Sequence, residues 1–283
     1  MSSSPKIPVD LSGAGYFHKL GLTGKNVTVA ILDSGLAPHP DIARSRILAF
    51  KDFVNEKTEP YDDFTHGTHV AGIIGSTRIG IAPKVNLVGI KILDRHGNCS
   101  IDTFINSVKW LLEHYKEFNI QIVNISVGGN HPELKQEKNI LNLWITKLWE
   151  EGLTICCSAG NNGPSPNSIY APGNCRKVIT VGSYDGGHFS SAGPLLPYIS
   201  KPELVAPGFH ILSTKPGSGY SVKNGTSMSV PFISGSCALL LQRYPHLTND
   251  QIKIRLMDAA YPVPFLPYNI QGAGVVSLKR LLA

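Results

Sequence analysis

The chain contains five short apolar runs that are rich in β-branched residues, a pattern typical of strands buried inside a sheet. These runs occupy residues 26–32, 85–93, 120–127, 153–159 and 177–183. After residue 184 the apolar segments shorten and glycine and proline become more frequent, which indicates hairpins or loops.

Amphipathic segments with helical spacing lie between and after these runs. They predict helices at residues 100–115, 133–151, 226–243 and 248–260. Ser100 stands at the N-cap position of the first of these helices, and Thr248 with Gln251 forms a capping box at the start of the last.

The alternation of strands and helices predicts an α/β fold with three layers. We expect a mostly parallel central sheet of about seven strands, with helices on both faces and right-handed crossovers. The sequence shows no internal repeat and no linker, so residues 1–283 are predicted to form a single domain. In such a sheet, functional groups gather at the carboxyl ends of the strands.

Composition narrows the class of protein further. The hydrophobic fraction of 42% and the charged fraction of 16% are those of a globular chain. The net charge of +6 comes without a long run of lysine or arginine, so we expect neither a nucleic-acid nor a membrane partner. The five cysteines fit neither a disulfide framework nor a zinc site, which favours a reducing, cytoplasmic compartment.

The start of the sequence bears on processing. It lacks the apolar stretch of a signal peptide, and we expect no prodomain and no transmembrane segment in the chain as given. The alternative is a secreted mature domain that has lost its signal and propeptide.

Three polar motifs stand where predicted strands end or predicted helices begin. Asp33 follows the first apolar run in "AILDSGLAPHPDI", His66 lies in "DFTHGTHVAGIIG", and Ser227 lies in "NGTSMSVPFISGSCALLLQ". Serine hydrolysis needs a hydroxyl nucleophile, a base that takes its proton and a carboxylate that orients the base. The chain order Asp, His, Ser is one of three known for that geometry.

These motifs and their spacing resemble those of the subtilisin-like serine proteases (subtilases), from about residue 14 to the last helix. "HGTHVAG" and "NGTSM" are the most specific matches. The resemblance implies a serine endopeptidase that works through an acyl-enzyme, with Asp33, His66 and Ser227 as its triad. "SAGNNG" (158–163) matches the family's oxyanion segment and implies that Asn161 and the Ser227 N–H hold the oxyanion; no cofactor is required.

Other interpretations of the same residues stay open at this point. Ser227 could be a helix cap, and Asp33 could cap a turn. His66 and His69 have a spacing seen in metal sites, although no third ligand stands at a plausible distance along the chain, and we expect no metal. A non-catalytic peptide-binding protein and a dedicated precursor-processing protease are the rival functions.

The resemblance also implies where a peptide or protein substrate binds. The peptide would add as a strand between two enzyme segments, and its P1 side chain would enter a pocket with its floor near residues 169–174. Tyr170 stands where many relatives have a small residue, and we expect it to favour small or medium apolar P1 side chains. The expected substrate-binding residues are Gly97, Asn98, Cys99, Ser126, Val127, Gly128, Ala159, Gly160 and Tyr170.

Two further expectations come from the same comparison of motifs. The segment "AGIIGSTRIGIAP" is short and lacks the asparagine-bearing insertion that supplies calcium ligands in many relatives, so we expect this calcium site to be missing. A propeptide or protein inhibitor outside this chain is a conceivable partner.

Overall fold

The computed structural model describes residues 4–129, 132–135, 138–185, 189–194 and 201–283. Within them, one sheet has the strand order β10-β11-β7-β6-β5-β4-β1-β3-β2, and β8 and β9 form a separate antiparallel hairpin. The strands of the sheet are β1 (Thr28–Asp33), β2 (Ile47–Asp52), β3 (Asn86–Lys91), β4 (Ile120–Ile125), β5 (Thr154–Ser158), β6 (Ile179–Ser183), β7 (Leu204–Ala206), β10 (Ala260–Tyr261) and β11 (Val275–Val276). The hairpin strands are β8 (Ile211–Thr214) and β9 (Tyr220–Lys223).

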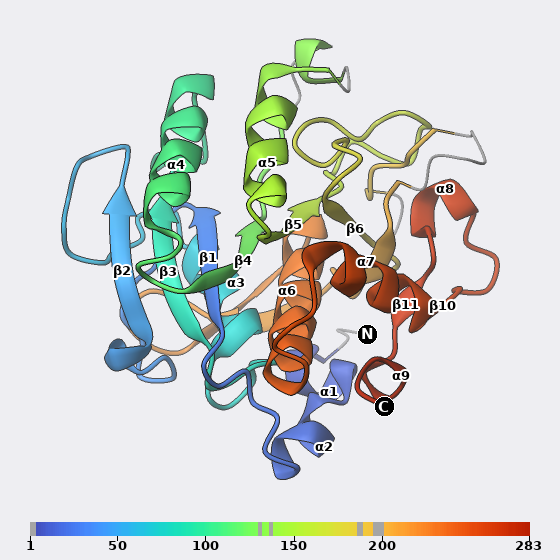
Figure 1. Ribbon diagram of the computed structural model, residues 1–283, viewed down its shortest axis with the longest axis horizontal. Coiled ribbons are helices and arrows are strands. Elements are labelled where there is room, and N and C mark those ends of the chain that lie inside the picture. The colour runs from blue at the N-terminus through green and yellow to red at the C-terminus, as the bar shows by residue number, and fades with distance from the viewer. Residues whose placement is uncertain (1–3, 130–131, 136–137, 186–188, 195–200) are drawn as a thin grey trace.

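Neighbouring strands from β2 to β7 run parallel, and the added strand β10 is antiparallel to β11. The sheet of the described residues has nine strands rather than the expected seven, because two pairs of residues near the C-terminus extend its edge. A mostly parallel α/β sheet is confirmed, and Figure 1 shows its central strands side by side.

Helices cover the sheet. The longer ones are α3 (His66–Gly75), α4 (Ile101–His114), α5 (Ile140–Glu150), α6 (Thr226–Arg243) and α7 (Asn249–Asp258). The short ones are α1 (Pro8–Ser12), α2 (Ala14–Lys19), α8 (Tyr268–Gln271), α9 (Leu278–Leu281) and the 3-10 turns η1 (Arg44–Arg46) and η2 (Pro132–Lys135). Figure 1 shows α1, α2 and α9 at the lower end of the molecule.

Helices α3 and α6 pack against each other and against the central strands, while α4 packs against α5. Because β1 is buried along its whole length, both faces of the sheet are covered, and the two helix pairs lie on opposite faces. The connections β2–α3–β3 and β3–α4–β4 advance along the sheet in the same direction but on opposite faces. They therefore have opposite hands, and the expectation that all crossovers are right-handed is wrong for one of them.

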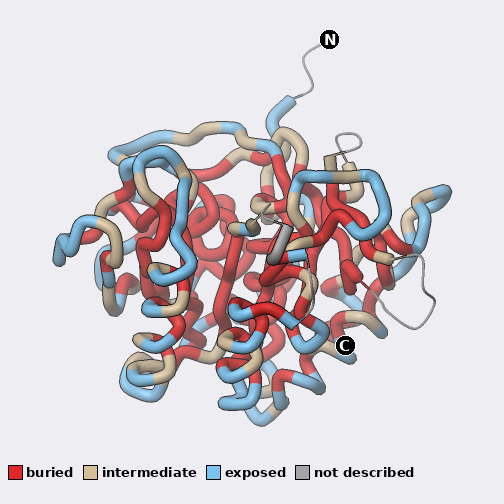
Figure 2. The backbone as a smooth tube through the Cα atoms, turned by 90° about the horizontal axis from the view of Figure 1, so that it is seen from above, coloured by how far each residue is buried: buried red, intermediate tan, exposed pale blue. Residues whose placement is uncertain are grey.

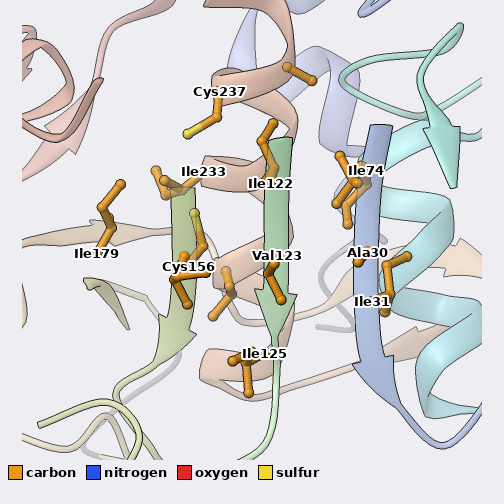
Figure 3. Packing of buried hydrophobic residues seen from close by; sticks show 14 of the residues in the cluster. Ala30, Ile31, Ile74, Ile122, Val123, Ile125, Cys156, Ile179, Ile233 and Cys237 are labelled. Carbon is orange, nitrogen blue, oxygen red and sulfur yellow. The ribbon is translucent and has the colours of Figure 1, made fainter. Parts of the chain in front are cut away.

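The core lies on both faces of the sheet, against α6 on one and against α4 and α5 on the other, and the side chains of α6 are buried along most of its length. Figure 3 shows Ile233 and Cys237 of α6 facing Ile122 and Cys156 of the sheet, and Figure 2 shows how buried segments occupy the interior while exposed loops surround it. Cys156 is fully buried and serves as a small apolar side chain, as expected.

The predicted helix over residues 133–151 is wrong in its first half. Residues Pro132–Lys135 form a 3-10 turn, residues 136–137 lie outside the described part, and α5 begins only at Ile140. The side chain of Asn139 accepts a hydrogen bond from the Asn142 N–H and so starts the helix there. The predicted caps at Ser100 and at Thr248 with Gln251 are both confirmed.

None of the helices in the described ranges is long and apolar enough to cross a membrane. All five cysteines are free thiols, four of them buried and Cys99 exposed. The extent of the domain over the whole chain stays a prediction.

Candidate active site

The strands β3, β1, β4 and β5 are neighbours and run parallel, so their carboxyl ends meet along one edge of the sheet. Asp33 is the last residue of β1, Ser126 directly follows β4, and Ala159 directly follows β5. Two helices begin at the site: His66 is the first residue of α3 and Ser227 the second residue of α6. Segments far apart in sequence thus bring their polar ends to the place where α/β folds bind ligands.

Asp33 and His66 form a direct acid–imidazole pair. The His66 Nδ1 lies 2.8 Å from Asp33 Oδ1 and 2.9 Å from Asp33 Oδ2. The Asp33 side chain is fully buried, whereas 17% of the His66 side chain is exposed. Burial disfavours the charged imidazole, but the Asp33 carboxylate outweighs burial and raises the pKa of His66 above its ordinary value.

The start of α3 is held by Asp62, a residue that the sequence reasoning missed. Asp62 Oδ1 accepts hydrogen bonds from the backbone N–H groups of Phe64 and Thr65, and Oδ2 accepts from the Thr68 N–H and hydroxyl. These bonds use carboxylate oxygens to satisfy N–H groups that have no partner inside the helix. Asp62 therefore fixes the turn that presents His66.

Gly67, next to His66, allows α3 to approach the end of β1 closely. A Cβ atom at this position would lie 2.1 Å from the carbonyl oxygen of Gly35. Only glycine fits such a contact with backbone. The glycine itself is visible in the motif "HGTH", but the sequence does not show why it is needed, because its contact partner Gly35 is about thirty residues away.

The Ser227 hydroxyl is hydrogen-bonded to the end of β4. Its Oγ donates to the Ser126 carbonyl oxygen at 2.7 Å, and the Ser126 Oγ donates to the Ser227 carbonyl oxygen at 3.1 Å. The Asn124 amide in turn donates to Ser126 Oγ and accepts from the hydroxyl of Ser234 in α6. Across the described residues, no hydrogen bond joins Ser227 to His66. The hydroxyl in this structure faces Ser126.

Asn161 is held by the residue that precedes Ser227. Its Oδ1 accepts from the Thr226 N–H at 3.0 Å and from the Thr226 hydroxyl at 3.2 Å. The Thr226 hydroxyl also accepts from the Gly160 N–H. These bonds occupy the Asn161 Oδ1 and leave the Nδ2 group available to donate to a bound substrate. Gly225 adopts φ of 131°, and a Cβ there would lie 3.3 Å from this nitrogen.

A cavity of about 440 Å³ opens beside these groups. It is lined by every predicted substrate-binding residue except Ser126. The hydroxyl and carbonyl of Ser126 are instead hydrogen-bonded to Ser227. Tyr170 lies in its wall and is partly buried against the core. The cavity also has apolar lining that the sequence reasoning assigned to the core or did not discuss: Leu93, Ile101, Phe104, Leu134 and Leu141.

Residues 24–274 match the family model described as the subtilase family (Peptidase_S8). The chain belongs to the subtilase family. It is 38% identical over 297 residues to the serine protease AprX of Bacillus subtilis, and 34% identical over 260 residues to subtilisin E of the same species. These alignments cover 92% and 87% of this chain, but only 66% of AprX and 64% of subtilisin E.

A solved structure agrees with the family assignment. The crystal structure of a cold adapted subtilisin-like serine proteinase superimposes with a TM-score of 0.75 and 28% identity. The match covers 90% of this chain and 88% of the other. The predicted family and fold are thus confirmed for this subtilase.

His69 of the subtilase occupies a different environment from His66. It is fully buried, and its Nε2 lies 3.1 Å from the carbonyl oxygens of both Ile211 and Ser221, so this nitrogen carries a proton and donates. Burial lowers the pKa of His69 to about 3. Nε2 is therefore not available to a metal. Nδ1 is buried without a hydrogen-bond partner, but no cluster of three or more His, Cys, Asp or Glu side chains that could hold a metal occurs among the described residues.

Proposed function

We propose that this subtilase is a serine endopeptidase. The observation that carries the proposal is the buried Asp33–His66 hydrogen bond, which lies on the same edge of the sheet as Ser227 and Asn161, beside the cavity. The arrangement supports the roles of Asp33, His66 and Ser227 as acid, base and nucleophile. The substrates would be peptides or proteins, bound along the segments that line the cavity.

The proposed reaction begins with a rotation of the Ser227 hydroxyl. Its Oγ leaves the Ser126 carbonyl and turns to the unprotonated Nε2 of His66, which accepts the proton as Oγ attacks the scissile carbonyl carbon. Hydrogen bonds of this kind are often long or missing without substrate. His66 then gives its proton to the leaving amine, and water hydrolyses the acyl-enzyme by the same route.

The charge of the tetrahedral intermediate would be stabilised by two donors. Ser227 lies in the first turn of α6, where backbone N–H groups have no partner inside the helix and the helix dipole favours negative charge. The Asn161 Nδ2 supplies the second donor, preorganised by Thr226.

Digestion of an unstructured protein such as β-casein tests this function. Wild type should release many fragments and Ser227→Ala none above background. Intact casein together with intact short peptides would contradict the endopeptidase proposal. One or two cuts would favour a precursor-processing role. We further propose a cytoplasmic location, supported by the five free thiols.

The acid limb of activity should report the His66 environment. Only neutral His66 can accept the Ser227 proton, so kcat/KM should fall as pH drops through the His66 pKa, which lies above its ordinary 6.5 because of Asp33. A pH profile of kcat/KM with a peptide substrate measures this limb. A midpoint below 6.5 would contradict this prediction and show that burial of the imidazole outweighs the Asp33 carboxylate.

We propose that Tyr170 limits the P1 pocket. Chromogenic peptides that differ only at P1 should be cleaved best with alanine or another small to medium apolar side chain. Tyr170→Ala should raise kcat/KM for phenylalanine relative to alanine at P1 by about tenfold. The proposal fails if wild type already prefers large aromatic side chains.

We propose that the short loop after α3 holds no calcium ion. Calcium takes six to eight oxygen ligands. The Asp41 carboxylate at this loop instead accepts hydrogen bonds from the Arg78 N–H and the Tyr220 hydroxyl, and the Asp41 carbonyl accepts from the Thr77 N–H. The loop thus turns donors toward Asp41, and its residues do not fit the ion.

Thermal unfolding with and without calcium tests whether the loop after α3 binds the ion. EDTA should leave the melting temperature within about 2 °C of its value in calcium buffer, because a ligand that is not bound stabilises nothing. A large drop would mean that calcium binds somewhere in the protein.

A further inference from the structure

The ammonium group of Lys223 lies next to the catalytic base. Lys223 is the last residue of β9, four positions before Ser227. Its Nζ donates to the hydroxyl of Thr65 at 3.0 Å, and Thr65 directly precedes His66. The hydrogen bond fixes the cation near His66, where its charge opposes that of Asp33 and makes the rise in the His66 pKa smaller.

No carboxylate of the described chain forms an ion pair with Lys223. Some lysines of the described chain do have such partners: Lys91 pairs with Asp63, and Lys201 pairs with Glu203. An ammonium group has three donors, and the Thr65 hydroxyl uses one of them. Lys223 therefore presents an unpaired, positioned positive charge.

The carboxylates nearest to His66 are already occupied. Asp33 accepts from His66 and from the Ser34 N–H. Asp62 accepts bonds from Thr65 and Thr68, among others. Since no carboxylate of the described residues pairs with Lys223, its ammonium group is available to a carboxylate of a bound substrate.

Lys223 and Thr65 lie outside the cavity. The cavity extends from Ser227 and Asn161 over Tyr170 and the segment Gly97–Cys99, which is where the acyl half of a substrate would lie. His66, which follows Thr65 in the chain, is not among the residues that line this cavity. The residues after the scissile bond leave the nucleophile on the side of His66, which protonates their amine.

We propose that Lys223 selects substrates with an acidic side chain in the first two positions after the scissile bond, P1′ and P2′. The inference rests on the proposed endopeptidase function. An exposed ion pair of this kind changes kcat/KM by a modest factor that salt weakens. Glutamate at P1′ or P2′ should be preferred over lysine by about five- to tenfold at low ionic strength.

Internally quenched peptides test the selection. They share one P4–P1 sequence with alanine at P1 and carry Glu, Gln or Lys at P1′ or P2′. For wild type, kcat/KM should follow Glu > Gln > Lys, and the difference should shrink in about 0.5 M salt. Lys223→Met should bring the Glu/Lys ratio close to one, and Lys223→Glu should reverse it.

Lys215 supplies a matched control. It lies in the turn of the same hairpin, at the opposite end from Lys223, and it is exposed. Lys215→Met removes the same charge and should leave the Glu/Lys ratio unchanged. Ratios within one variant cancel any general effect of the substitution on His66 or on the amount of folded enzyme.

A p-nitroanilide with the same P4–P1 sequence has no residue after the scissile bond. It therefore reports catalytic activity independently of any selection at P1′ or P2′. If wild type cleaves neither the anilide nor any peptide, the endopeptidase proposal fails. If wild type cleaves them but shows no preference among Glu, Gln and Lys, or if Lys223→Met keeps the preference, the inference about Lys223 is wrong.

Discussion

Asp33→Asn should lower kcat by about 10⁴-fold while the protein stays folded. The Asp33 carboxylate accepts the Nδ1–H of His66 and so leaves Nε2 free to receive a proton. An asparagine amide would favour the other imidazole tautomer and would not stabilise the imidazolium. Steady-state kinetics on the best peptide substrate measure the loss, and KM should change much less than kcat.

A second buried carboxylate serves as the control for this substitution. Asp52 is almost fully buried and accepts hydrogen bonds from the N–H groups of Val54 and Asn55 and from the Tyr61 hydroxyl. Asp52→Asn should lower the melting temperature but keep kcat within about threefold of wild type, because it contacts no reacting group. A comparable loss of kcat in both variants would mean that Asp33 acts through stability alone.

Asn161→Ala should lower kcat by about 10²–10³-fold, the loss typical of removing one oxyanion donor, with little change in KM. The amide donor contributes mainly when the oxyanion forms, so its removal costs more in the transition state than in the bound substrate. Separate measurement of kcat and KM distinguishes this role from simple substrate binding. A rise in KM of the same size with an unchanged kcat would contradict the oxyanion role of Asn161.

Thr226 offers an independent check on the position of Asn161. Thr226→Val removes the hydroxyl that donates to Asn161 Oδ1 and accepts from the Gly160 N–H, and it should reduce kcat about tenfold. Thr226→Ser keeps the hydroxyl and should restore most of the activity. If both variants behave alike, the hydroxyl does not position the amide.

The sequence allowed the ends of strands and the starts of helices to be predicted, and these are the places where Asp33, His66, Asn161 and Ser227 lie. Parallel strands bring such ends together, so a polar residue at a strand end is informative without any contact being known. The missed residues differ in this respect. Asp62 looks like an ordinary loop residue, and Thr226 acts through an amide sixty-five positions away.

The other differences have similar physical causes. The Ser227–Ser126 bond joins residues one hundred and one positions apart, and spacing along the chain does not reveal it. The helix predicted over residues 133–151 was wrong in its first half, because residues 133–138 are mostly good helix formers but include only one apolar residue, and Asn139 caps the helix that follows. The strands β10 and β11 have two residues each, too few for a periodic pattern to appear.

Labelling with a fluorophosphonate probe tests the central claim most directly, because the probe reacts only with a serine whose proton is removed by a neighbouring base. We expect rapid labelling of wild type, none of Ser227→Ala, and strongly slowed labelling of His66→Ala. Equal labelling of wild type and Ser227→Ala, or no labelling of folded wild type, would contradict it.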